Sequence, residues 1–188
     1  LTADVTVSDG TLDVTFPAVY ADKACVNGIE VTPVSVADQA FLDFVQKKMF
    51  WYFWNESDVT TGLVKSTEDN WKAGYGYISS IAVDGFALSV YTVAADRGWI
   101  TRQQAYDRVS KILTTFETRL QHVHGFWYHF VNLSTGAREL NSEISTVDSA
   151  LFILGALQAG EYFRSDHPDV ASRADALYRR MDWAWFSN

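Results

Sequence analysis

The sequence predicts a mainly α-helical domain of stacked helical hairpins, with a short β-rich segment in front of it. From residue 34 onwards, apolar residues recur at intervals of three and four in five segments, which is the spacing of helices. The connections between these segments alternate between short and long, as in stacked hairpins, and no alternating run between them is long enough for a substantial sheet. With 48% hydrophobic residues among 188, the chain can fill a core of ordinary size.

The first 33 residues follow the two-residue period of β-strands. Two alternating runs flank the dipeptide Asp9-Gly10, and a third run covers residues 25–31. Asp-Gly between two such runs is typical of a tight hairpin turn, because that turn needs positive φ angles. A proline then interrupts the strand pattern. We therefore expect two parts, with strands in residues 1–33 and helices in residues 34–188.

Local signals mark several ends of the five predicted helices. Thr101 stands three residues before Gln104, the spacing of a capping box. Gly98 can end the preceding helix, and Pro168 suits a first helical turn. The fourth helix is apolar nearly all round, so we expect it to be buried on several sides. The expected ranges are about 40–54, 79–97, 101–122, 145–163 and 168–185, with one short strand at 126–131.

Composition excludes several classes of function. The formal net charge is −8 and no run of Lys or Arg is present, whereas binding to nucleic acid phosphates needs clustered basic residues. No apolar stretch approaches the roughly 20 residues of a membrane span. The chain contains neither a GxSxG motif nor a phosphate-binding glycine loop, and we expect no cofactor. His122, His124 and His129 lie near one another, but no ligand spacing completes a metal site, so no metal is expected.

The chemistry concentrates between residues 124 and 148. An aromatic block, 126–130, precedes a polar turn and three carboxylates, Glu139, Glu143 and Asp148, at the start of an apolar helix. Aromatic faces beside carboxylates are typical of sites that cleave sugars. Glu143 is the preferred proton donor, because partial burial against the helix would raise its pKa. The alternative is that Glu143 only interacts favourably with the helix dipole. Glu139 is expected to be solvated.

Asp148 and three aromatic residues complete the predicted site. Asp148 lies about 140° around an ideal helix from Glu143, so we expect it to be a cap, a substrate hydrogen-bond partner or an orienting partner of Glu143. Trp127 and His129 would share one face of the short strand and could line the site, with core packing as the alternative. Trp71 lies in the long polar segment 55–77 and is the best candidate for a ring that stacks on sugars.

Four segments together resemble one family: GWITRQQAYDRVSKIL, HGFWYHFVNLSTG, ELNSEISTVDSALFILGAL and LYRRMDWAWF. Over roughly residues 40–186 they are similar to the glucoamylase-like family that includes bacterial endo-β-1,2-glucanases. The resemblance implies an (α/α)6 barrel, twelve helices in two rings around a funnel, of which this chain supplies the N-terminal half. It also implies a catalytic glutamate at Glu143. The family's Asp-Arg pair after the "tGL" turn is replaced here by Lys65-Ser66-Thr67, so no role is carried over to that position.

The β-rich segment carries a second resemblance. The phrase GTLDVTF…ACVNGIEV is similar to the last strands of malectin-like β-sandwich domains, over about thirty residues. Because it would supply only the end of such a domain, no function is carried over from it.

We therefore expect a bacterial, periplasmic or secreted glycoside hydrolase that acts on a β-glucan, with β-1,2-glucan as the expected substrate. The alternatives are a glucan transglycosylase and a non-catalytic carbohydrate-binding helical module. A third function, an interaction scaffold of stacked helical hairpins that binds no sugar, is disfavoured because no sequence repeat is visible. The C-terminal half of the domain, with the second catalytic carboxylate, is expected outside this chain, which could then be inactive alone.

Overall fold

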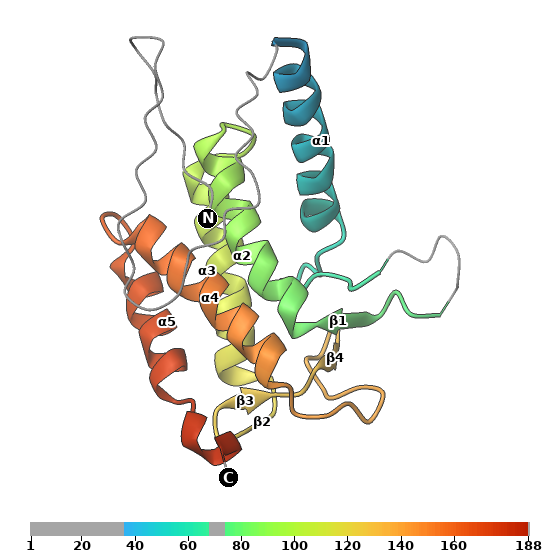
Figure 1. The fold of residues 1–188 in the computed structure, drawn as a ribbon, viewed down its shortest axis with the longest axis vertical. Helices are drawn as coiled ribbons and strands as arrows, with labels where there is room; N and C mark the ends of the chain where they lie inside the picture. Colours follow the sequence, from blue (N-terminus) through green and yellow to red (C-terminus); the bar gives the residue numbers. More distant parts are fainter. Residues whose placement is uncertain (1–35, 68–73, 188) are drawn as a thin grey trace, which may run out of the picture. The chain divides into compact units, whose positions relative to one another are not determined.

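The computed structural model describes residues 36–67 and 74–187 (Figure 1). The predicted strands in residues 1–33 lie outside this part, as does Trp71. The described residues form five α-helices and one 3-10 helix: α1 Val36–Asn55, α2 Ile81–Asp96, α3 Arg102–Thr118, α4 Thr146–Phe163, α5 Pro168–Arg179 and η1 Trp183–Ser187. The prediction of a mainly α-helical domain is confirmed.

Helices α2 and α4 form the centre of the bundle. They lie side by side, with α5 packed against α4 and α3 packed against α2 (Figure 1). Both central helices begin at the end of the bundle that also holds four short strands. These strands are β1 Ile78–Ser80, β2 His122–Val123, β3 Phe126–Trp127 and β4 Phe130–Asn132. β1 pairs with β4 and β2 pairs with β3, both antiparallel.

Two glycines allow α2 and α4 to approach until their backbones touch. A Cβ on Gly85 would lie 2.6 Å from both the carbonyl oxygen of Leu151 and the Cα of Phe152, and a Cβ on Gly155 would overlap the carbonyl oxygen of Gly85. Around this crossing the core is filled by large side chains. Phe116 of α3 stacks on Phe152 with 3.4 Å between ring centroids. Close contact of the two backbones therefore fixes the spacing of the central helices.

Two expectations about the elements are wrong in detail. The strand expected at 126–131 is interrupted at His129, where the chain changes partner from β2 to β1. The last helix ends at Arg179, not near residue 185, because the N–H of Asp182 donates to the carbonyl of His124 and draws the chain out of the helix. Helix α4 is buried on several sides, but within the described residues Val147 and Leu154 on it are exposed.

The predicted capping box at the start of α3 is present. The Thr101 hydroxyl accepts from the backbone N–H of Gln104, and the Gln104 side chain accepts from the backbone N–H of Thr101. We expect Thr101→Ala to lower the free energy of unfolding by about 1 kcal/mol, because the backbone N–H of Gln104 loses its hydrogen-bond acceptor in the first turn of α3. Urea unfolding measures this change. Thr101→Ser keeps the hydroxyl and serves as the control, and an equal loss in both variants would contradict the capping explanation.

Candidate active site

A short antiparallel pairing brings the predicted site residues together. Tyr128 and Ile144 form a β-bridge, the N–H of His129 donates to the carbonyl of Glu143, and the N–H of Ser145 donates to the carbonyl of Trp127. In this register His129 stands directly opposite Glu143. Residues directly opposite in an antiparallel pair hold their side chains on the same face and within contact distance. The backbone pairing therefore accounts for the contact between these two side chains.

The imidazole of His129 lies between two carboxylates. Its Nδ1 is 2.9 Å from Oε1 of Glu143, and its Nε2 is 3.4 Å from Oδ2 of Asp148. The two contacts form a row, Glu143–His129–Asp148, which joins the loop before α4 to the first turn of α4. The predicted set of Glu143, His129 and Asp148 is thus brought together in space.

Glu143 is exposed, which corrects the expectation of partial burial. Its side chain keeps 67% of its accessible surface. Hydrogen bonds from its own backbone N–H and from His129 lower the pKa of Glu143, and the positive charge of Arg138 acts in the same direction. The opposing effect of burial on the pKa is smaller, because the side chain is exposed, so the carboxyl group is ionised near neutral pH. Its assignment as the catalytic proton donor stays a prediction.

Asp148 lies in the first turn of α4 beside the N-cap residue, so the cap is Ser145 and not Asp148 itself. The hydroxyl of Ser145 accepts from the backbone N–H of Asp148 and donates to Oδ2 of its carboxylate at 2.6 Å. The Asp148 side chain is 13% exposed. Its contact with His129 makes it an indirect partner of Glu143, and its expected orienting role stays a prediction. Direct contact of Asp148 with substrate stays a prediction.

Trp127 is a core residue, and the expectation that it lines the site is wrong. It has no exposed surface, and its ring meets Phe116 and Phe152 edge to face, each with 5.2 Å between centroids. Strand alternation predicts that Trp127 shares a face with His129, but β3 ends at Trp127, and Phe116 of α3 and Phe152 of α4 cover its ring. The other predicted aromatic residue, Trp71, lies outside the described residues.

A tight turn at residues 139–142 directly precedes Glu143. The N–H of Ser142 donates to the carbonyl of Glu139, and the two central residues, Leu140 and Asn141, have φ angles of 55° and 49°. Positive φ at both central positions is the pattern of a type I′ turn. Glu139 is half-buried and accepts from the side-chain amide of Asn132 at 3.1 Å, so it is not simply solvated as expected.

Asp84 is a buried carboxyl group that the sequence prediction missed. It lies in the first turn of α2 with no exposed surface, where it accepts from the N–H of Val64 at 2.9 Å and from the hydroxyl of Ser79 at 3.0 Å. Burial raises the pKa of Asp84 to about 8, and these two hydrogen bonds only partly oppose that effect. The signal in the sequence is a lone Asp within the apolar run IAVDGFAL. Asp84 connects the loop after α1 to the beginning of α2.

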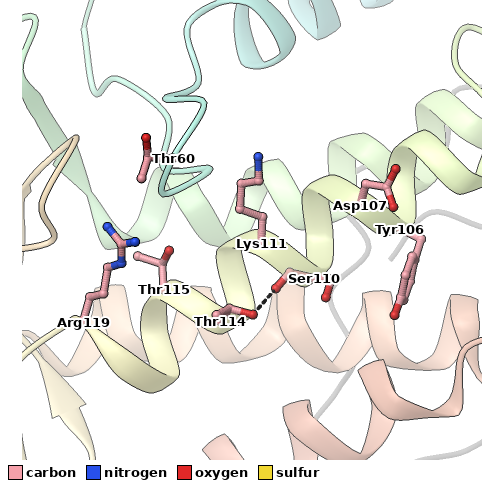
Figure 2. Close-up of a pocket in the computed structure, with 8 residues that line it drawn as sticks. All are labelled: Thr60, Tyr106, Asp107, Ser110, Lys111, Thr114, Thr115 and Arg119. Atoms are coloured by element: carbon pink, nitrogen blue, oxygen red, sulfur yellow. Dashed lines mark hydrogen bonds between the residues drawn. The ribbon is translucent and has the colours of Figure 1, made fainter.

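A surface pocket of about 300 Å³ lies away from these residues. Figure 2 shows it against α3, lined by Thr60 from the loop after α1 and by Tyr106, Asp107, Ser110, Lys111, Thr114, Thr115 and Arg119. Neither Glu143 nor His129 lines this pocket.

In residues 36–67 and 74–187 no helix is long and apolar enough to cross a membrane, and no group of three His, Cys, Asp or Glu side chains could hold a metal ion.

The chain is similar in sequence to a curated protein. The chain is 24% identical over 166 residues to the exo β-1,2-glucooligosaccharide sophorohydrolase (non-reducing end) of Parabacteroides distasonis. The alignment covers 84% of this chain and 22% of that protein, so the chain spans about a fifth of the length of this relative. No family model matches the chain.

Solved structures with the same fold agree with this similarity. An endo-β-1,2-glucanase from Chitinophaga pinensis, in complex with sophorotriose and glucose, superposes with a TM-score of 0.73 at 23% identity, over 78% of this chain and 37% of that chain. A candidate glucoamylase from Bacteroides uniformis gives a TM-score of 0.72 at 27% identity, over 81% and 38%. Over about four fifths of its length the chain therefore shares the helical fold of the glucoamylase-like proteins, and the predicted resemblance to that family is confirmed.

Proposed function

We propose that this chain is part of a glycoside hydrolase that acts on β-1,2-linked glucan, with Glu143 as a catalytic carboxylate. The relatives supply the substrate class, because the names of two of them describe action on β-1,2-linked glucose polymers or oligomers. A bacterial origin and a periplasmic or secreted location belong to the same proposal.

The observation that carries the proposal is the exposed, ionised carboxylate of Glu143, held by His129 where α2 and α4 begin. Glycoside hydrolysis needs a carboxyl group that protonates the leaving oxygen and a carboxylate that activates water or attacks carbon. Glu143 reaches solvent and can exchange a proton with a bound sugar or with water. Asp148 already accepts from Ser145 and contacts His129, which favours a supporting role.

We expect Glu143→Gln to lower kcat on β-1,2-glucan by about 10²–10⁴-fold, because an amide can neither donate nor accept the proton of acid–base catalysis. Release of reducing sugar by the intact protein measures this rate. Glu139→Gln is the matched control, since Glu139 belongs to the same loop but is bonded to Asn132. Its rate should stay near that of the unmodified protein. An unchanged rate in Glu143→Gln would refute the assignment of Glu143.

The same assay separates the alternatives. Transglycosylation would yield longer or rearranged glucans in place of short reducing sugars. A carbohydrate-binding module would bind β-1,2-glucan without any turnover, and that outcome would refute hydrolysis.

A further inference from the structure

The backbone of His129 connects the beginnings of both central helices. Its N–H donates to the carbonyl of Glu143 at 3.0 Å, three residues before α4 begins. Its carbonyl accepts from the N–H of Ile81 at 3.2 Å, and Ile81 is the first residue of α2. The first N–H groups of a helix have no partner within the helix, so the His129 carbonyl supplies one for α2. The position of the His129 backbone is thus fixed by two elements that are distant in sequence.

The side chain of His129 is fixed as well. One face of its ring stacks on Phe130, with 3.7 Å between centroids and 17° between planes. Both ring nitrogens face carboxylates, Glu143 at Nδ1 and Asp148 at Nε2. Only 28% of the side chain remains exposed. With one face stacked and both nitrogens directed at carboxylates, the ring offers little surface for a sugar.

We propose that His129 is a positioning residue that, held by Asp148, fixes the direction of the Glu143 carboxylate. The inference rests on the proposed function of Glu143 and replaces the expectation that His129 lines the substrate site. Asp148 is itself fixed by Ser145 at the start of α4, so the chain of contacts runs from a helix end to an exposed acid. Because Glu143 is otherwise exposed, its side chain would sample several rotamers without this contact.

Two amide variants separate the two contacts of the ring. The side-chain nitrogen of Asn stands near the place of His Nδ1, and that of Gln near the place of His Nε2. His129→Asn can therefore keep a donor toward Glu143, whereas His129→Gln can reach Asp148 but not Glu143. The backbone bonds of residue 129 are available in both variants, and near-ultraviolet circular dichroism checks that each is folded.

The test is the titration of the Glu143 carboxyl carbon by NMR, assigned through its loss in Glu143→Gln. The pKa of Glu143 is lowered partly by His129, so we expect it to rise toward the ordinary value in His129→Gln and to stay low in His129→Asn. In the intact protein, kcat on β-1,2-glucan should fall at least about tenfold in His129→Gln with little change in KM, since misplacement of a catalytic group affects the reacting complex. His129→Asn should recover part of this loss.

The two proposals can fail separately. A Glu143 titration in folded His129→Gln that matches the unmodified protein would overturn the positioning role, whatever the activity. Full activity of Glu143→Gln would overturn the proposed function, while the titration would still report whether His129 orients Glu143.

Discussion

Gly155→Ala is expected to lower the free energy of unfolding by about 2 to 4 kcal/mol, because the added methyl group would overlap the backbone of α2 at Gly85. Neither backbone can yield without separating the two central helices. In an ordinary helix the same substitution raises stability by roughly 1 kcal/mol, since alanine favours the helix more than glycine does. The sign of the change therefore distinguishes close backbone contact from simple helix propensity.

Urea unfolding followed by circular dichroism measures the effect. Leu154→Ala, at the neighbouring exposed position of α4, is the control and should change stability by less than about 0.5 kcal/mol. A Gly155→Ala protein that is more stable than the unmodified one would show that α2 and α4 do not touch as described.

Asp84→Asn is expected to remove a large pH dependence of stability. Burial raises the pKa of Asp84 from 3.8 to about 8, so the folded protein keeps a proton there that the unfolded chain releases. Between about pH 4 and 8 the unfolded state binds fewer protons, and stability falls by up to about 1.4 kcal/mol for each pH unit as pH rises. Below this window both states are protonated, and above it both are ionised. Asparagine cannot titrate, and its amide can still bond Val64 and Ser79.

Urea unfolding at pH 5 and pH 8 checks this expectation. The loss of stability between the two pH values should be several kcal/mol larger in the unmodified protein than in Asp84→Asn. Asp58→Asn is the control, because the pKa of Asp58 is lowered and its contribution is lost only at more acidic pH. Equal losses in the unmodified protein and Asp84→Asn would mean that Asp84 is ionised in the folded state.

The helices could be predicted because their signals are local. The capping box at Thr101, the cap at Ser145 and the proline at the start of α5 depend on residues within one helical turn. The left-handed Gly98 after α2 is of the same kind, with a φ of 69°. Such features need no knowledge of tertiary packing. They also predicted that α4 begins near residue 145, with Asp148 in its first turn.

The parts that could not be predicted depend on distant contacts. The burial of Trp127 follows from α3 and α4 closing over it, through Phe116 and Phe152. The position of Glu143 is set by its pairing with His129, fourteen residues earlier in the chain. The apolar helix that follows Glu143 therefore does not bury its side chain, contrary to the expectation from sequence. Side-chain periodicity in a strand of two residues carries too little information to decide which face is buried.

The contact of Gly85 with Gly155 also sets the position of the beginning of α4, because it fixes α4 against α2. Asp148 lies seven residues before Gly155 on α4, which is about 10 Å along the helix axis. If α4 tilted by about 10° about this contact, Asp148 would move by nearly 2 Å at a rise of 1.5 Å per residue, and His129 would lose its support. Misplacement by about 1 Å can reduce catalysis a hundredfold. Substitutions at Gly85 or Gly155 should therefore change the direction of the Glu143 carboxylate even where the protein still folds.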